Sequence, residues 1–121
     1  MANKEPIERY IEAQSERYIE AQILNYLRGQ KIYCWKNTSV GYFDAKIGRF
    51  RKQSSPYAIK GTSDILGIIA VGRCLAIEVK SKYGKVSPEQ LAFIKKINEN
   101  GGLAFVARSL EEVIKCLSEN L

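Results

Sequence analysis

The fold is decided by residues 63–80, which read SDILGIIAVGRCLAIEVK. This segment consists of two short apolar runs on either side of Gly72, each of strand length and rich in Ile, Leu and Val. Such runs, when they are bounded by glycine, are typical of strands buried on at least one face. We therefore predict an antiparallel pair of strands, 63–71 and 73–80, joined by a tight turn at Gly72.

The second of these strands carries a charged pair on one of its faces. Because successive side chains of a strand alternate, Glu78 and Lys80 share the face opposite to the apolar residues between them. A turn centred on Gly72 places Asp64 opposite Lys80 and Leu66 opposite Glu78. Two carboxylates and an ammonium group are therefore expected to converge at one end of the hairpin.

These three charged side chains fit two interpretations. Carboxylate oxygens bind Mg²⁺ or Mn²⁺, and such a metal stabilises the charge that develops in phosphodiester hydrolysis and lowers the pKa of a bound water. A lysine beside the metal can orient or deprotonate that water. The alternative is an exposed strand face with an ion pair, and the six residues 75–80 alone leave it open. The chain has no histidine, so any catalysis depends on carboxylates, lysine, tyrosine or metal-bound water.

Length and composition narrow the class of protein. A chain of 121 residues fits one domain, and 45% hydrophobic residues is ordinary for a folded protein. No apolar run approaches the roughly 20 residues of a membrane-spanning helix, and the amino terminus lacks a secretory signal, so we expect a cytoplasmic protein. Three widely spaced cysteines argue against a disulfide framework and against a zinc site.

Basic residues are concentrated between residues 41 and 62, in a chain whose formal net charge is +6. This segment combines aromatic residues with a single acid and five cations, and we predict a hairpin or a long loop. It suits contacts with DNA phosphates and bases, although a dimer-swapping hairpin or a solvated loop is also open. We prefer DNA contact because five cations are costly to bury together. The candidate DNA-binding residues are Lys46, Arg49, Arg51, Lys52 and Lys60, joined by Lys82 and Lys85 beyond the second strand.

Helices and further strands surround this centre. We predict helices over 6–27, 88–100 and from 110 onward, and strands over 31–38 and 103–107. Ser87 is expected to cap the second helix, with Gln90 closing a capping box. Trp35 is expected in the core and Asn37 in a turn that could lie near the charged residues. Because helices interleave with strands, the sequence indicates an α/β fold with a mixed sheet flanked by helices.

The first helix contains a duplicated heptapeptide. Residues 8–14 and 16–22 both read ERYIEAQ. The offset of eight residues rotates the second copy by about 80° around the helix axis, so the two copies cannot share a face. Glu16 and Glu20 fall on the same stripe as the apolar Ile23 and Leu27, where a carboxylate needs a partner.

Four segments in this order resemble the VRR-NUC family of PD-(D/E)xK nucleases: residues 61–66, 76–80, 84–90 and 101–107. The similarity spans roughly residues 15–113. It implies a restriction-endonuclease-like fold, with residues 1–121 as a single nuclease domain and residues 1–14 as a helical extension. Ser63 stands where the superfamily's name puts proline, a departure that leaves the ligand set intact.

The resemblance also implies roles for individual residues. Asp64 and Glu78 would bind Mg²⁺ or Mn²⁺ together with the Val79 carbonyl. Lys80 would assist the nucleophilic water. Gln90 would face the site, and this role is compatible with its expected role in the capping box. The family also uses a glutamate on the first helix. Its usual spacing from the helix end selects Glu16 as a further metal ligand and catalytic residue, with Glu20 as second choice.

In function, the resemblance implies a metal-dependent DNA endonuclease of DNA repair. Stand-alone members resemble homodimeric enzymes that cut branched DNA such as Holliday junctions. Two alternatives stay open: a DNA-binding module without turnover, and a nuclease subunit that needs a partner for its specificity.

Overall fold

The computed structural model describes residues 5–38, 42–51 and 55–121. The helices are α1 (Pro6–Gly29), α2 (Pro88–Glu99) and α3 (Leu110–Asn120), and a short 3-10 turn, η1, covers Ala70–Gly72. The strands are β1 (Tyr33–Lys36), β2 (Tyr42–Asp44), β3 (Arg49–Arg51), β4 (Ile65–Ile69), β5 (Arg73–Val79) and β6 (Leu103–Ala107). Within these ranges, no helix has the length and apolar character needed to cross a membrane.

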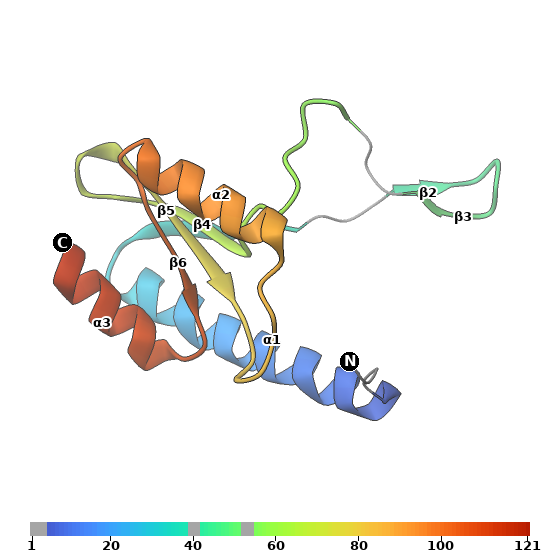
Figure 1. The fold of residues 1–121 in the computed structure, drawn as a ribbon, viewed down its shortest axis with the longest axis horizontal. Coiled ribbons are helices and arrows are strands. Elements are labelled where there is room, and N and C mark those ends of the chain that lie inside the picture. The colour runs from blue at the N-terminus through green and yellow to red at the C-terminus, as the bar shows by residue number, and fades with distance from the viewer. Residues whose placement is uncertain (1–4, 39–41, 52–54) are drawn as a thin grey trace.

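The central sheet has four strands in the order β1-β4-β5-β6. The pairs β1–β4 and β4–β5 are antiparallel, whereas β6 runs parallel to β5 after the crossover through α2. The mixed sheet that the sequence predicted is therefore confirmed. Strands β2 and β3 form a separate antiparallel hairpin, which projects away from the sheet (Figure 1). This hairpin forms the first part of the basic segment 41–62, so the predicted hairpin is confirmed there, whereas residues 55–62 contain no strand.

The two faces of the sheet are covered unequally. Helices α1 and α3 pack on one face and α2 on the other (Figure 1). The hydrophobic core lies on the α1–α3 side, where Ile23, Leu27, Ile77 and Val113 are completely buried. Each such side chain contributes about 1.5–3 kcal/mol by leaving water. Helix α2 contacts β5 and β6 and has no buried residue of its own. It covers mainly the β5–β6 half of its side of the sheet, and the β1–β4 half is more open.

The helix ends follow the predicted signals. The Ser87 side chain accepts a hydrogen bond from the Gln90 N–H, and the Gln90 side chain accepts one from the Ser87 N–H, which completes the capping box.

Trp35, however, is not a core residue. Its side chain is 40% exposed because Cys34, its neighbour on the strand, takes the buried face and turns Trp35 towards the α2 side.

The β4–β5 hairpin has the predicted strands and a different register. Ile65 pairs with Ile77, so the turn is centred on Val71, and the expected pairings of Asp64 with Lys80 and Leu66 with Glu78 were wrong. The cause is the turn η1, in which both Val71 and Gly72 adopt a positive φ. The shift is two residues, and an even shift keeps every side chain on its predicted face.

Val71 is strained in this turn, and this leads to a prediction. It is fully exposed and has φ 64°, a left-handed conformation that a β-branched residue rarely adopts. Val71→Gly should raise the free energy of unfolding by about 0.5–1 kcal/mol, because relief of strain exceeds the entropy that glycine loses on folding. Urea denaturation measures this gain. Val71→Thr, also β-branched, serves as the control and should show no gain.

The duplicated heptapeptide is used unequally. The second copy, residues 16–22, lies against the sheet, whereas the first copy extends beyond the sheet edge towards the amino terminus (Figure 1). In that first copy Tyr10 and Ile11 are more than half exposed. Only the second copy therefore lies where it can contact the sheet.

Candidate active site

Asp64 precedes β4 and is fixed by the backbone on both sides. Its Oδ2 accepts a hydrogen bond from the Val79 N–H at 2.8 Å, and its carbonyl accepts one from the Asn37 N–H at 2.7 Å. The first bond ties Asp64 to the end of β5. The second places Asn37 next to the candidate site, as one of the sequence alternatives proposed.

Glu78 is the most deeply buried of the charged candidates, with 2% of its surface exposed. Its Oε1 accepts a hydrogen bond from Gln90 Nε2 at 2.7 Å and lies 3.7 Å from Lys80 Nζ. Its Oε2 is also buried and has no hydrogen-bond partner among the described residues. A buried carboxylate oxygen without a partner is energetically costly, which makes it an anomaly for a purely structural residue.

The surroundings of Glu78 change its ionisation. Burial, and then the nearby charge of Asp64, raise the pKa of Glu78 to about 8, against the opposing effect of Lys80. Without a further cation, the proton is therefore held by Glu78 at neutral pH. Two carboxylates that cannot both ionise are the arrangement that a bound divalent cation relieves.

Gln90 makes both of the contacts that the sequence predicted for it. Its side-chain oxygen closes the capping box at Ser87, while its side-chain nitrogen donates to Glu78. The approach of α2 to the site depends on Gly61, which has φ +82°. A Cβ at Gly61 would collide with the backbone of Glu89 and Gln90, so glycine allows the chain before Asp64 to run against the start of α2.

The two candidate glutamates of α1 have other partners in this structure. Glu16 Oε1 accepts a hydrogen bond from the Ser81 N–H at 3.3 Å, just beyond Lys80. Glu20 Oε1 forms an ion pair with Lys36 Nζ at 3.0 Å. In the described ranges no group of three or more acidic, histidine or cysteine side chains is gathered for a metal. The structure therefore brings Asp64 and Glu78 together, whereas Glu16 contacts the loop that follows them.

One residue near the site was missed by sequence reasoning. Arg108, at the end of β6, donates from a single guanidinium nitrogen to three carbonyls of the loop after Lys80: Ser81 at 2.6 Å, Lys82 at 3.3 Å and Gly84 at 2.8 Å. The only local signal in the sequence is its position between the predicted strand 103–107 and the predicted helix cap Ser109. Its partners lie more than twenty residues away, where no local pattern reveals them.

The candidate DNA-binding cations lie on the surface where they can be described. Lys46, Lys60, Lys82 and Lys85 are exposed, and Lys82 Nζ lies 5.4 Å from the centre of the Tyr83 ring. Arg49 and Arg51 belong to β3 of the projecting hairpin, and Lys52 lies outside the described residues.

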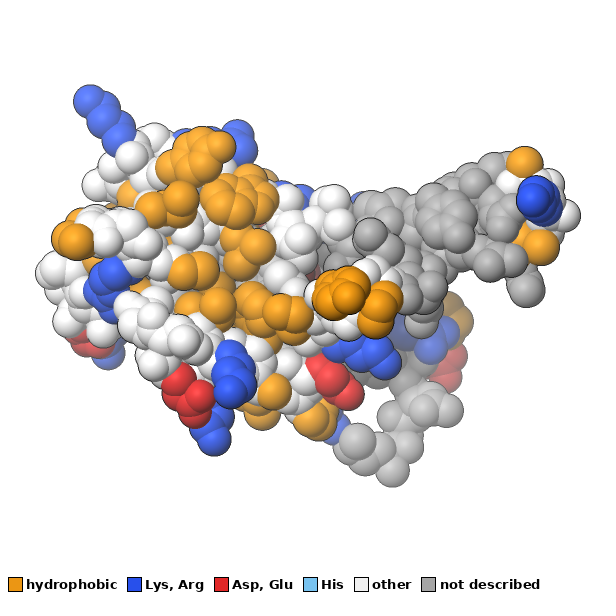
Figure 2. Space-filling view, turned by 90° about the horizontal axis from the view of Figure 1, so that it is seen from above, with side chains coloured by type: hydrophobic (Ala, Val, Ile, Leu, Met, Phe, Trp, Pro, Cys, Tyr) orange, Lys and Arg blue, Asp and Glu red, His pale blue; other side chains and the backbone are white. Residues whose placement is uncertain are grey.

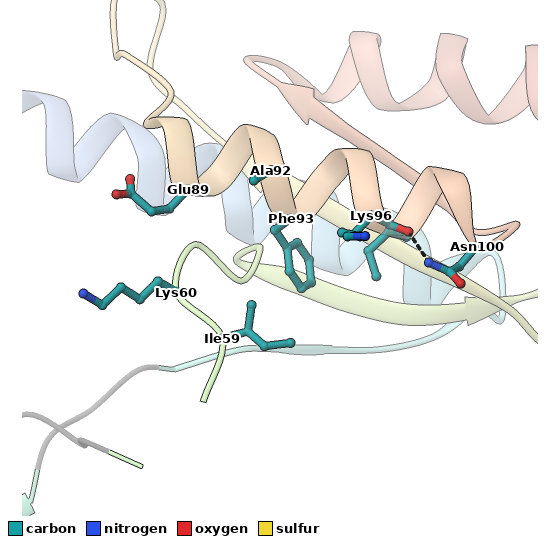
Figure 3. A pocket seen from close by; sticks show the side chains of 8 residues that line it. Ile59, Lys60, Glu89, Ala92, Phe93, Lys96 and Asn100 are labelled. Carbon is teal, nitrogen blue, oxygen red and sulfur yellow. Dashed lines mark hydrogen bonds between the residues drawn. The ribbon is translucent and has the colours of Figure 1, made fainter. Parts of the chain in front are cut away.

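A groove of about 410 Å³ lies along the flank of α2 (Figure 3). Its walls come from Phe93 and Ile97 on the helix and from Ile59 and Lys60 on the segment before Gly61. None of Asp64, Glu78 and Lys80 lines it. The groove is therefore a feature separate from the carboxylate site.

Comparisons with known proteins agree with this architecture. The sequence pattern of the VRR-NUC domain family matches residues 12–111. A solved structure described as a VRR_NUC domain protein is similar with a TM-score of 0.60 and 23% identity, over 85% of this chain and 84% of the other. A second, described as a VRR_NUC domain, has a TM-score of 0.59 and 20% identity, over 88% and 98%. A search of curated proteins found no match. The chain therefore belongs to the VRR-NUC domain family, which has a nuclease-type fold that acts on DNA.

Proposed function

We propose that the protein is an endonuclease that hydrolyses DNA phosphodiester bonds with Mg²⁺ or Mn²⁺. The observation that carries the proposal is the pairing of the buried Glu78 carboxyl with that of Asp64, in which Glu78 Oε2 has no hydrogen-bond donor among the described residues. A surface ion pair would not require this burial. Two carboxyl groups that would bind a hard cation together account for it.

The residues present fit such a cation. Asp64 and Glu78 would hold it together with the Val79 carbonyl, and two carboxylates suit Mg²⁺, which keeps several of its water ligands. The metal, when bound, stabilises charge on the phosphodiester. Lys80, whose ammonium is held near Glu78 at 3.7 Å, would orient the attacking water, and Gln90 would fix the Glu78 carboxylate through its 2.7 Å hydrogen bond.

Glu16 has a smaller part in this proposal. Because its carboxylate bonds to the Ser81 N–H, it would position the loop directly after Lys80, and it would be the further carboxylate ligand that α1 offers to the metal. Glu20 remains the second candidate for that contact.

For the substrate we propose branched DNA, cut by a homodimer in the manner of a Holliday-junction resolvase, as part of DNA repair in the cytoplasm of a phage-infected or bacterial cell. The net charge of +6 favours a polyanion, and the projecting basic hairpin suits a substrate with arms in several directions. Two alternatives are a DNA-binding module without turnover and a nuclease subunit that depends on a partner for specificity.

The test is a panel of single-stranded, duplex, flap and four-way-junction DNAs with Mg²⁺, Mn²⁺ or EDTA. We expect metal-dependent cleavage, fastest on the junction, and no cleavage by Glu78→Ala. Equal cleavage by both proteins would refute the assigned site. Binding without cleavage in every metal would favour the binding module, and cleavage without preference would favour the partner-dependent subunit.

The hairpin gives a second prediction. Replacement of Arg49, Arg51 and Lys52 with Ala should weaken DNA binding and reduce the slope of log affinity against log salt by about 0.9 for each lost phosphate contact. Fluorescence anisotropy over a series of salt concentrations measures both effects. The control is Lys95→Ala with Lys115→Ala, two exposed lysines of α2 and α3. An unchanged slope in the hairpin variant would exclude the hairpin from DNA contact.

A further inference from the structure

The turn that follows β5 carries an exposed tyrosine between two lysines. Residues 81–84 form this turn, which is closed by a hydrogen bond from the Gly84 N–H to the Ser81 carbonyl at 3.1 Å. Lys82 and Tyr83 occupy its two central positions, and Tyr83 is 75% exposed. Lys85 comes directly after the turn and is also exposed. Packing in the core therefore does not account for the tyrosine.

The turn itself is firmly anchored. Ser81 is buried, and its N–H donates to Glu16 Oε1 of α1 at 3.3 Å. Arg108 donates to three carbonyls of the turn. Gly84 is buried as well, and a Cβ there would lie only 3.0 Å from Ser81 Oγ and 3.2 Å from Glu16 Oε1. A turn held in this way presents its two exposed residues in a fixed place, so a ligand that binds them loses little entropy by ordering the chain.

The Tyr83 ring is suited to a flat partner. Lys82 Nζ lies 5.4 Å from the centre of the ring, where a cation is attracted to the electron-rich face. The ammonium can cover only one face, and the exposure of Tyr83 leaves room for a second contact. Nucleobases stack on exposed aromatic rings, and lysines beside such a ring suit the phosphates that accompany each base.

Tyr83 also lies close to the candidate active site. It follows Lys80 by three residues, and three residues of chain span at most about 11 Å. Lys80 Nζ in turn lies 3.7 Å from Glu78 Oε1. A stacked DNA strand advances by about 3.4 Å for each nucleotide, so a reach of about 11 Å corresponds to roughly three nucleotides. A strand held at the carboxylates would therefore bring a nearby base to the ring.

We propose that Tyr83 stacks on a base that is unpaired or lies at a branch point, within roughly three nucleotides of the bond that is cut. Inside a continuous duplex both faces of every base are covered by neighbouring base pairs, so the ring finds no open face. Tyr83 thereby favours branched or single-stranded DNA over continuous duplex. This inference rests on the proposed function, because it names the substrate feature that the proposed site recognises.

Another exposed aromatic group has different surroundings. Tyr33 is 73% exposed on the edge strand β1, with its ring 5.6 Å from that of Trp35 between centroids. It pairs with Ile68, farther along β4 from Asp64. The space-filling view of the α2 side shows a broad area of apolar side chains with few charged groups inside it (Figure 2). Tyr33 is therefore the matched control for Tyr83, with similar exposure and a place away from the carboxylates.

DNA affinity tests the stacking without cleavage. In a Glu78→Gln background with Mg²⁺, fluorescence anisotropy measures binding to flap DNA and to a continuous duplex of equal length. Tyr83→Ala should weaken flap binding about fivefold to a hundredfold and leave duplex binding unchanged. Tyr83→Phe, which keeps the ring, and Tyr33→Ala should retain both affinities. Equal losses on both DNAs, no loss on either, or a loss in Tyr83→Phe would overturn the inference.

Salt dependence separates stacking from charge. Stacking releases no counterions, so Tyr83→Ala should weaken flap binding by the same factor at every salt concentration. Lys82→Ala should instead reduce the slope of log affinity against log salt by about 0.7–0.9, the value of one phosphate contact. A reduced slope in Tyr83→Ala would mean that the ring only places the Lys82 ammonium, and it would refute the stacking.

A fluorescent base locates the contact. 2-Aminopurine, which is quenched when it stacks, is placed in turn at the unpaired positions next to the branch of the flap DNA. The protein with Tyr83 and the Tyr83→Phe variant should quench it at one of these positions, and Tyr83→Ala should not. Equal fluorescence with all three proteins would contradict the proposal. Circular dichroism and thermal unfolding establish that each variant is folded.

Failure of this inference and failure of the proposed function give different results. Cleavage is measured separately in the chain that retains Glu78. Mg²⁺-dependent cleavage of flap DNA together with unaltered flap affinity in Tyr83→Ala would overturn the stacking alone. Quenching that depends on Tyr83, in a chain that cuts no DNA with either metal, would overturn the proposed hydrolysis and leave the stacking in place.

Discussion

Glu78→Gln should abolish DNA cleavage and at the same time stabilise the metal-free protein at pH 8. We expect cleavage to fall at least about a thousandfold, because an amide is a weak ligand for Mg²⁺ and cannot replace a charged carboxylate. Stability should rise because the amide removes a buried charge and can donate towards Asp64 in place of the unpartnered Oε2. Opposite effects on stability and activity are the mark of a residue kept for function.

The pH dependence follows from the raised pKa. Glu78 has a pKa of about 8 in the folded chain and 4.5 as its ordinary value, so the folded state binds the extra proton between these pH values. The stabilisation of the folded state by the proton on Glu78 is fully present below pH 4.5 and is lost as the pH rises through about 8. The free energy of unfolding of the metal-free protein should therefore fall by on the order of 3 kcal/mol between pH 5 and pH 8.

Urea denaturation at pH 5.5 and pH 8, with EDTA or with Mg²⁺, measures this effect. Mg²⁺ should restore stability at pH 8 in the unaltered chain and have little effect on Glu78→Gln. Glu99→Gln is the matched control, because Glu99 forms only surface ion pairs with Lys95 and Lys96 and should leave both stability and cleavage unchanged. A Glu78→Gln protein that is destabilised at pH 8 would contradict the proposed electrostatics.

Local sequence patterns predicted much of the fold. The alternation along 75–80 correctly placed Glu78 and Lys80 on one face, and Ser87 with Gln90 correctly predicted the start of α2. The register of the β4–β5 hairpin was not predictable, because Val71 adopts a positive φ that the sequence does not favour. The site was preserved despite this error, since the shift was an even number of residues.

Features that depend on distant contacts were beyond the sequence. The choice between Glu16 and Glu20 depends on which turn of α1 lies over the loop after β5, and helical periodicity places both on one stripe. Trp35 looked like a core residue because burial of an aromatic side chain is the common case. Its exposure depends on how far α2 extends across the sheet, which only the assembled structure shows.

Arg108→Ala should have the second-largest effect, on stability and cleavage together. Its guanidinium holds the carbonyls of Ser81, Lys82 and Gly84, and charged donors form the stronger class of hydrogen bond. Their loss should lower the free energy of unfolding by about 2–4 kcal/mol. The loop follows Lys80 directly, so its release should also lower kcat about tenfold to a hundredfold through a misplaced ammonium group.

Arg73→Ala separates positioning of Lys80 from general stability. Arg73 also donates to backbone carbonyls, those of Gly101 at 3.0 Å and Asn120 at 3.3 Å, but at the opposite end of β5. It should lose stability and keep its cleavage rate in conditions where both variants remain folded. Arg108→Lys should recover part of the rate, since its ammonium can still bond to some of these carbonyls. Equal rates for the two alanine variants would restrict Arg108 to a structural role, because β5 would then tolerate the same loss at either end.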